Sequence, residues 1–595
     1  MFPNVPFDLR VALTRSFALL VSFAAAMTGF VVFMQIGDLD GLDGFDWFRG
    51  PLILISTFWL GWGAVQAMMG LAMPVRVPPP LTTPIRGRTV ILVPVYNEDP
   101  VATFARIAAM DADLHLAGLP GQLHFAILSD TNDAAIAQAE RHWFTHLVAE
   151  TGGEGRMFYR RRTTNRGRKA GNIEDFIRQS GAAYDYALIL DADSLMSAAT
   201  IAEMIRRMDA DPRLGLLQAA PMIIRAQSRF GRSMQFSAAF HGPVFGRGLQ
   251  LMQGRTGPFW GHNALVRVRA FAASCGLPEL VGKPPFGGHV MSHDYVEAAM
   301  LARAGWTVRF DADLTGSFEE APENIITFAK RDRRWCQGNL QHARIVLAPG
   351  LKPWSRFVFV QGILAYIAPV LWIAFLVASV IAPAFAPPPD YFPLPFWPFP
   401  VFVGDNAGKA ASLIVGVFGL LFLPKLLVGL DAALRGRARG FGGIWAAGVS
   451  TVMELVLSSV VAPVLLMYQT RSVAQVMLGR DGGWPAQSRG DGSLSLREAW
   501  IGSHWIVTTG LLVLSASWFL SPGLIPWLLP VAGPMLLAPL IISWTSQPSQ
   551  TRLLTTPAEA RPDRVIGLAD SVLARWTGTD DGGRDVALAQ PVIYA

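Results

Sequence analysis

The sequence predicts a mostly parallel α/β domain that is inserted between transmembrane helices. Of the 595 residues, 51% are hydrophobic and only 16% are charged, whereas a soluble globular protein carries about 25% charge. The long apolar runs stand toward the two ends of the chain. Between them, the composition is that of a soluble domain in which apolar strand patterns alternate with helical patterns.

The rest of the composition excludes a disulfide scaffold and gives no reason to expect nucleic acid. Two cysteines, Cys275 and Cys336, are too few for a disulfide framework. The formal net charge of +6 is modest, and it suits a protein that faces an anionic membrane surface. We therefore expect a lipid bilayer as a partner and no nucleic acid.

Residues 1–75 are expected to form a transmembrane hairpin. Its two apolar runs, at about 16–36 and 51–73, reach the roughly 20 residues that a span needs. An acidic loop separates them, whereas Arg10 and Arg15 precede the first run. The positive-inside rule then places the N-terminus and the chain beyond residue 75 in the cytoplasm. A cleaved signal peptide is the alternative for the first run, although no small-residue cleavage site is visible.

Residues 76–350 are expected to form a cytoplasmic α/β domain. Apolar strand patterns stand at 88–96, 123–130 and 186–193. Helical patterns lie between and after them, which predicts a mostly parallel sheet with helices on both faces. Ligands of such sheets bind at the carboxyl ends of the strands. Asp130 and Asp191 stand at two of these ends.

Residues 351–548 are expected to return to the membrane. Spans are predicted at about 357–383, 410–430, 503–521 and 523–545. The apolar segment 443–468 is long enough to cross, but arginines flank it on both sides. We therefore favour an interfacial or re-entrant segment there over a span. The polar tail, 549–595, shows no clear period and is expected in the cytoplasm.

Two motifs of the predicted α/β domain suit an anionic ligand such as a diphosphate. Asp191 and Asp193 can share one hard divalent cation, Mg²⁺ or Mn²⁺, which would offset charge on a leaving diphosphate. The alternative is that one of them caps the next helix. Lys169, Gly171 and Asn172 open a helix, where free backbone N–H groups form an anion site. For any single arginine of the cationic run 160–169, the alternative is a solvated loop.

Two further motifs suit sugar transfer. Asp294 begins a predicted helix, where it is either a general base or an N-cap. Arg334 and Trp335 combine a phosphate-binding fork with an aromatic face that packs on sugar C–H surfaces. The alternative for this pair is a Trp/Arg belt beside the membrane.

These motifs occur in a recognisable order. They read VPVYNED (93–99), SD (129–130), KAGN (169–172), DAD (191–193), GHNALVR (261–267), HD (293–294) and RDRRW (331–335). The set resembles the membrane-integrated processive family 2 glycosyltransferases, which include cellulose synthase and hyaluronan synthase. KRDRRWCQGNLQH (330–342) and SHDYVEAAMLARAGW (292–306) are most similar to the glucans biosynthesis glucosyltransferase H group. The resemblance implies a GT-A-type fold for the α/β domain.

The resemblance also implies a role for each motif. On the nucleotide, it implies that Asp130 contacts uracil and that Lys169, Gly171 and Asn172 embrace the nucleotide. On the diphosphate, it implies that Asp191 and Asp193 hold the metal and diphosphate, and that Arg334 contacts the diphosphate. For the acceptor, it implies that Asp294 is the base and that Trp335 stacks on the sugar. Two departures from the family pattern are Arg331 at a glutamine position and Ser292-His293 before Asp294. Relatives place a gating loop where this chain has residues 479–493, with Trp484, Gln487 and Arg489 as candidates.

The function implied by the resemblance is an inner-membrane inverting glucosyltransferase. It would polymerise glucose from UDP-glucose onto a growing glucan, with a β-1,2 backbone, and export the product as an osmoregulated periplasmic glucan. Acyl carrier protein and periplasmic glucan-processing proteins are implied partners. The alternatives are a synthase of another exported polysaccharide and a transporter or flippase with a nucleotide-binding domain. A transporter should carry paired ionisable residues near midspan, and the charges here stand near a span end.

Overall fold

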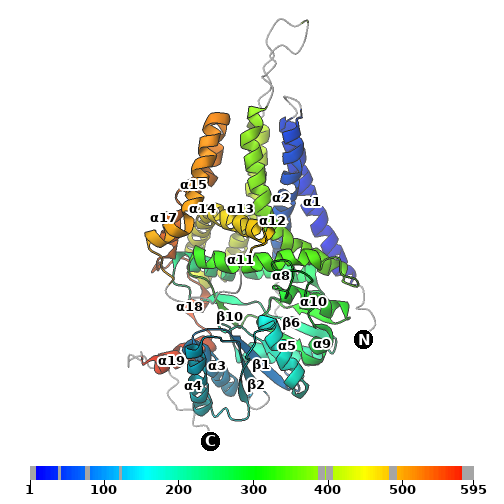
Figure 1. Cartoon of the computed structure of the whole chain (residues 1–595), viewed down its shortest axis with the longest axis vertical. Coiled ribbons are helices and arrows are strands. Elements are labelled where there is room, and N and C mark those ends of the chain that lie inside the picture. The colour runs from blue at the N-terminus through cyan, green and yellow to red at the C-terminus, as the bar shows by residue number, and fades with distance from the viewer. Residues whose placement is uncertain are drawn as a thin grey trace.

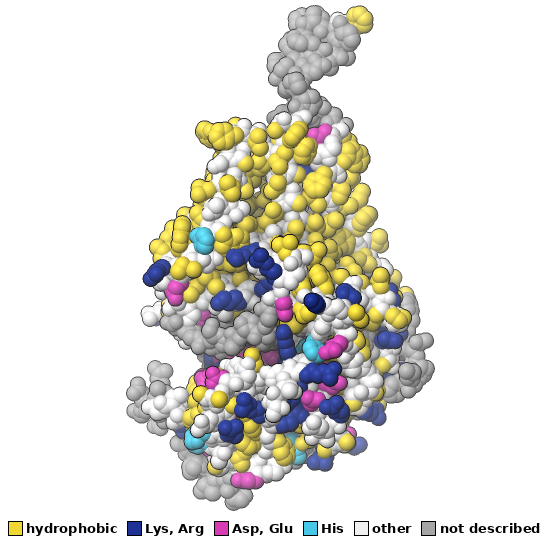
Figure 2. Space-filling model, in the orientation of Figure 1, with side chains coloured by type: hydrophobic (Ala, Val, Ile, Leu, Met, Phe, Trp, Pro, Cys, Tyr) yellow, Lys and Arg dark blue, Asp and Glu magenta, His cyan; other side chains and the backbone are white. Residues whose placement is uncertain are grey.

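The computed structural model describes residues 8–37, 42–73, 81–119, 123–385, 396, 407–481 and 492–578. Long upright helices occupy one end of the molecule and an α/β domain occupies the other (Figure 1). Figure 2 shows hydrophobic side chains over the upright helices, whereas charged side chains gather from the boundary toward the α/β domain. This separation is that expected for a domain beside a membrane.

The α/β domain is built on a seven-stranded sheet of order β3-β2-β1-β4-β8-β6-β9. Its strands are β1 (Thr89–Val95), β2 (Leu123–Ser129), β3 (Met157–Arg161), β4 (Tyr186–Ile189), β6 (Leu214–Gln218), β8 (Ala264–Arg267) and β9 (Thr307–Phe310). Only β8 runs antiparallel to its neighbours. A second sheet has the order β5-β10-β7, with β5 (Leu195–Met196), β10 (Ser317–Glu320) and β7 (Met222–Ile224). The mostly parallel sheet is confirmed.

Helices cover both faces of the sheet, because its central strands are apolar on both sides. One face packs against α3 (Pro100–Leu116), α4 (Ala134–Thr151), α6 (Ala198–Ala210) and α19 (Arg564–Thr577). The other packs against α5 (Arg168–Ser180), α9 (Val268–Ser274) and α10 (His293–Arg303). In β1, Ile91 and Val93 face the first layer while Val90 and Leu92 face the second.

Within the described residues, six helices are long and apolar enough to cross a membrane. They are α1 (Leu9–Gly37), α2 (Gly44–Ala72), α12 (Pro353–Ile381), α13 (Ala407–Leu434), α14 (Ile444–Met477) and α15 (Leu496–Leu520). Between them and the sheet lie α7 (Arg229–Phe240), α8 (Gly242–Gln253) and α11 (Ile325–Gln341). In Figure 1, α11 lies across the view, whereas α1, α2, α12 and α15 stand upright.

Helix α14 contacts the α/β domain and its adjoining helices along its length. Near its start, Ser450 Oγ accepts from the Leu554 N–H at 3.0 Å. One turn later, Glu454 lies 3.8 Å from His241, between α7 and α8. Near its end, Gln475 accepts from Arg333 of α11 at 3.1 Å. Both ends of α14 therefore contact the α/β domain or its adjoining helices, and the interfacial or re-entrant interpretation of 443–468 stays a prediction, since α14 is also long and apolar enough to cross.

The C-terminal part has two features that the sequence patterns did not show. Residues 523–545 form a bent pair and not one straight helix, because α16 (Ile525–Leu536) and α17 (Ala538–Ser546) meet at an angle of 55°, so the expected span is broken or re-entrant. Pro539 lacks an N–H and its ring crowds the carbonyl one turn back, which breaks the helix. The tail also has more structure than its weak pattern suggested. It forms α18 (Pro557–Ala560) and α19, which packs on α3.

Candidate active site

A cavity of about 760 Å³ opens at the carboxyl ends of the central strands. Most of the site residues predicted from the sequence line it: Asp130, Lys169, Asp191, Asp193, Asp294, Arg334 and Trp335. They come from segments as far apart as β2 and α11. The sheet topology gathers them because parallel strands end at a common edge.

Asp191 and Asp193 lie on the tight turn that follows β4. The Asp191 N–H donates to Ser194 Oγ at 2.9 Å, and its carboxylate forms an ion pair with Lys169. Helix α6 is capped by Ser197, whose side chain accepts from the Thr200 N–H. The helix-cap interpretation of the two aspartates is therefore wrong, and both residues line the cavity.

The carboxylates of this turn fit a hard divalent cation such as Mg²⁺ or Mn²⁺. Glu319 of β10 lines the same cavity. Burial raises the pKa of Glu319; His262 opposes the shift, and the negative charges of Asp193 and Asp191 add to it. Within the described residues, no group of three or more His, Cys, Asp and Glu is spaced to hold a metal. A cation held by Asp191 and Asp193 would therefore take its other ligands from diphosphate oxygens or water.

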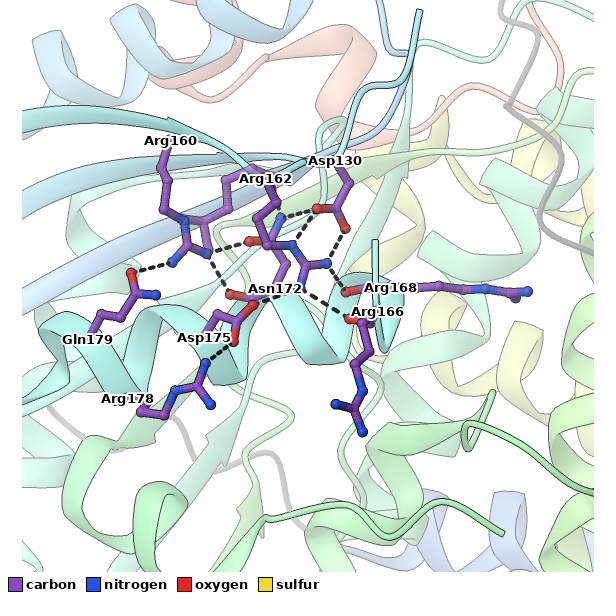
Figure 3. A network of polar contacts seen from close by, with 10 residues as sticks. Asp130, Arg160, Arg162, Arg166, Arg168, Asn172, Asp175, Arg178 and Gln179 are labelled. Carbon is purple, nitrogen blue, oxygen red and sulfur yellow. Dashed lines mark hydrogen bonds and ion pairs between the residues drawn. The ribbon is translucent and has the colours of Figure 1, made fainter. Parts of the chain in front are cut away.

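A network of polar contacts fixes Asp130 at the end of β2 (Figure 3). Arg162 donates to both Asp130 carboxylate oxygens, at 2.8 and 2.7 Å, and pairs with Asp175 at 2.9 Å. Its guanidinium also donates to the carbonyls of Arg166 and Arg168, so it holds the turn that leads into α5. Burial raises the pKa of Asp130 and the bonds from Arg162 oppose that shift.

Asn172 and Gly171 do not line the cavity, so their predicted contact with the nucleotide is not what the structure shows. Asn172 is fully buried and donates to Asp130 Oδ1 at 2.8 Å and to the Leu128 carbonyl at 3.0 Å. A Cβ on Gly171 would lie 2.2 Å from the Arg166 carbonyl oxygen. Both residues therefore position the loop that presents Lys169, because helix α5 turns them inward.

Asp294 lies in the first turn of α10, but Ser292 is the N-cap residue. The Ser292 hydroxyl donates to Asp294 Oδ1 at 2.9 Å. A Cβ on Gly261 would lie 3.7 Å from Asp294 Oδ2, and the Gly261 carbonyl accepts from Lys169 at 2.7 Å. The N-cap interpretation of Asp294 is therefore wrong. The Asp294 carboxylate therefore lies beside the same glycine, Gly261, whose carbonyl binds Lys169.

His293 lines the cavity beside Asp294 and forms an ion pair within α10. Its ring is buried and lies 3.1 Å from Glu297 one turn along α10. Burial lowers the pKa of His293, but the charge and hydrogen bond of Glu297 outweigh it and the net shift is upward. The pair ties the first turn of α10 to the next and so steadies Asp294.

Helix α11 brings Arg334 and Trp335 to the cavity. Arg334 is buried, and its pKa is lowered by burial and by the neighbouring Arg331. Trp335 is 45% exposed, and the Arg331 guanidinium lies 4.7 Å from its ring centre. Tyr366 of α12 also lines the cavity, and its hydroxyl donates to Asp332 at 2.9 Å. The cavity therefore continues from the sheet edge to a membrane helix.

Several cavity residues were missed by sequence reasoning. They are Tyr96, Glu98, Arg168, Trp260, His262, Glu319, Arg331 and Asn339. His262 belongs to the quoted GHNALVR motif, and Arg331 to RDRRW, so their motifs carried a signal. Glu319 had none, because one glutamate in a short strand looks like any other. Trp484, Gln487 and Arg489 of the expected gating loop lie outside the described residues.

Known protein families and proteins are similar to this chain in sequence. Residues 90–274 match the glycosyl transferase family 2, and residues 186–407 match the glycosyl transferase family group 2. A glucans biosynthesis glucosyltransferase H from Cereibacter sphaeroides is 62% identical over 567 residues, covering 95% of both chains. One from Vibrio cholerae is 38% identical over 570 residues, covering 92% of this chain and 78% of that protein.

A solved mannosyltransferase from Pyrobaculum calidifontis, in complex with GDP-Man and Mn²⁺, is also similar. It is 18% identical, covers 69% of this chain and 99% of that chain, and superposes with a TM-score of 0.43.

The fold and the site define a family 2 glycosyltransferase with a GT-A-like domain between membrane helices. Within that class, the chain belongs to the glucans biosynthesis glucosyltransferase H family. It is a membrane-bound glucosyltransferase of glucan biosynthesis, and it takes a nucleotide-sugar donor and a glucan acceptor.

Proposed function

We propose that the protein is an inverting glucosyltransferase of the bacterial inner membrane. In this proposal it adds glucose from UDP-glucose to a β-glucan, with a β-1,2 backbone, and exports the chain. One observation supports it most strongly. Asp294, the Asp191–Asp193 turn and Arg334 line a single cavity, and that cavity also contacts membrane helix α12.

The acceptor hydroxyl would bind on the Trp335 side of the cavity, where the exposed half of the indole offers a surface for sugar C–H groups. Asp294 accepts the hydroxyl proton as the oxygen attacks the anomeric carbon. The oxygen attacks in one displacement from the face opposite the bond to UDP, which breaks as the new bond forms, so the configuration at the anomeric carbon inverts. The hydrogen bond from Ser292 holds the Asp294 carboxylate in one orientation during this step.

The leaving UDP carries growing negative charge on its diphosphate. Arg334 and Lys169 line the cavity and would offset that charge, and a forked guanidinium matches phosphate oxygens well. Asp191 and Asp193 would hold Mg²⁺ or Mn²⁺, which stabilises a diphosphate leaving group as a Lewis acid. Asp130, clamped by Arg162, would face the uracil base.

Export is supported by the position of α12. Gly362, Ala365 and Tyr366 of this helix line the same cavity as Asp294, so an elongated glucan would leave the site toward the membrane helices. The basic N-terminal flank supports a cytoplasmic α/β domain. If α1, α2, α12, α13, α15 and the bent pair α16–α17 cross the membrane and α14 does not, a fusion of alkaline phosphatase after residue 595 should be inactive in cells. An active fusion would contradict this even number of crossings.

One assay tests the whole proposal. Purified full-length protein in detergent is incubated with radiolabelled UDP-glucose, UDP-galactose or UDP-N-acetylglucosamine, with Mg²⁺, Mn²⁺ or EDTA, and with or without acyl carrier protein. We expect polymer from UDP-glucose and a divalent cation, and β-1,2 bonds on linkage analysis. Polymer from another donor, or equal activity in EDTA, would contradict the donor or the metal assignment respectively.

A further inference from the structure

Arg106 of α3 is a buried arginine that does not line the cavity, yet it contacts the turn that carries Asp191 and Asp193. Its side chain is 7% exposed. One guanidinium nitrogen donates to the Ala192 carbonyl at 3.3 Å, and another pairs with Glu320 at 2.6 Å. A buried guanidinium that binds the middle of a turn with two carboxylates can set the directions of both carboxylates.

The turn itself fixes only part of this geometry. The Asp191 N–H donates to Ser194 Oγ at 2.9 Å, and the Ser194 N–H donates to the Asp191 carbonyl at 3.1 Å. Both bonds join the two ends of the turn. The peptide between Ala192 and Asp193 is oriented by neither, and the contact from Arg106 acts on that peptide.

Strand β10 connects this contact to the cavity. Successive side chains of a strand point to opposite faces, and β10 places Glu319 in the cavity lining while Glu320 meets Arg106. The Phe318 position of β10 pairs with Leu195, directly after the turn. The strand therefore supports the metal-binding turn both through its backbone and through Glu320.

Arg225 holds Glu320 from the other side, and its backbone is strained in doing so. Its φ is +61°, a left-handed value that non-glycine residues seldom adopt. From there its guanidinium lies 3.3 Å from Glu320 and 2.5 Å from Asp570 of α19. Figure 1 shows α19 beside α3 at the end of the molecule far from the membrane helices. The tail helix thus reaches the turn through Arg225, Glu320 and Arg106.

We propose that Arg106 is a positioning residue for the metal-binding turn, and that Arg225 and α19 hold it there through Glu320. The inference rests on the proposed function in one respect, namely that Asp191 and Asp193 bind the cation. Asp570 is 60% exposed, and an exposed ion pair contributes little. The main effect should therefore come from Arg106, a smaller one from Arg225 and the least from Asp570.

The test measures Mn²⁺ binding directly. Free Mn²⁺ is followed by electron paramagnetic resonance as it is titrated into full-length protein in detergent with UDP. Arg106→Gln should bind Mn²⁺ about 10- to 100-fold more weakly, the range seen when groups behind metal ligands are changed. Arg156→Gln is the matched control. Like Arg106, Arg156 forms an ion pair with a carboxylate, but its partner is Asp111 of α3, away from the turn. Its Mn²⁺ affinity should be that of the wild type.

A second variant separates positioning from folding. Arg225→Gly relieves the left-handed φ, so the melting temperature should hold or rise, while Mn²⁺ affinity should fall. Arg575→Gln removes another α19 ion pair, to Glu150, and should leave Mn²⁺ affinity unchanged. If Arg106→Gln and Arg225→Gly both bind Mn²⁺ as tightly as the wild type, this inference is overturned while the proposed function still stands. No Mn²⁺ binding by the wild type with UDP overturns the metal role in the proposed function, and the inference with it.

Discussion

Replacing Asp294 with asparagine removes a base while keeping the local structure. The Ser292 hydroxyl donates to Asp294 Oδ1 at 2.9 Å, and the asparagine side-chain oxygen can accept the same bond. Ser292, not Asp294, is the N-cap of α10. The structural cost is therefore limited to losing a negative charge in the first turn of a helix, about 0.3–1 kcal/mol.

The catalytic cost should be much larger. Loss of a general base lowers the rate by about 10²–10⁴-fold, which corresponds to about 2.7–5.5 kcal/mol in the barrier. Donor binding should change little, because the diphosphate side of the cavity is formed by other residues, such as Lys169 and Arg334. We therefore expect a nearly normal UDP-glucose affinity together with a transfer rate reduced by two to four orders of magnitude.

The assay combines calorimetric titration of UDP-glucose with single-turnover transfer of radiolabelled glucose, on the same detergent preparation. Ser292→Ala is the matched control, since it removes the hydrogen bond to Asp294 but keeps the carboxylate. It should slow transfer far less than Asp294→Asn. Transfer at the wild-type rate by Asp294→Asn would refute the assignment of Asp294 as the base. A parallel loss of donor affinity would show instead that the substitution disturbs the cavity.

Three further predictions follow from the site. Asp193→Asn should lower transfer by at least about 10²-fold, because the cation supplies several kcal/mol of charge stabilisation, and wild type in EDTA should match it. Trp335→Ala should weaken acceptor binding by about 2- to 10-fold, seen as shorter products at unchanged donor affinity. Arg162→Gln leaves buried Asp130 without its cation, so the free energy of unfolding should fall by about 3–5 kcal/mol, measured by thermal melting, and the KM for UDP-glucose should rise.

Local patterns in the sequence determined the main elements of this protein. Strand β1 reads as a continuous apolar run because both of its faces are covered, and the runs of α1, α2 and α12 are long enough to span a membrane. A charged residue that ends an apolar strand has to emerge at the sheet edge. For this reason Asp130 and Asp191 were placed correctly from the sequence alone.

The tertiary structure decided what depends on contacts between distant segments. Asn172 looked like a ligand contact, but the packing of α5 against β2 turns it toward Asp130. Helix α19 begins after Asp563, which accepts from the Val565 N–H, and repeats apolar residues at helical spacing. The helical spacing of α19 could be predicted from the sequence, whereas the packing of α19 against α3 could not.

The physical reason lies in the range of the interactions. Hydrophobic periodicity and capping act over a few residues, so a sequence displays them directly. Ion pairs such as Arg106 with Glu320 or Arg162 with Asp130 form only where the fold brings charges together and excludes water. The sequence alone therefore determined which side chains stand at the sheet edge, and only the tertiary structure decided which of them face the cavity and which hold the others in position.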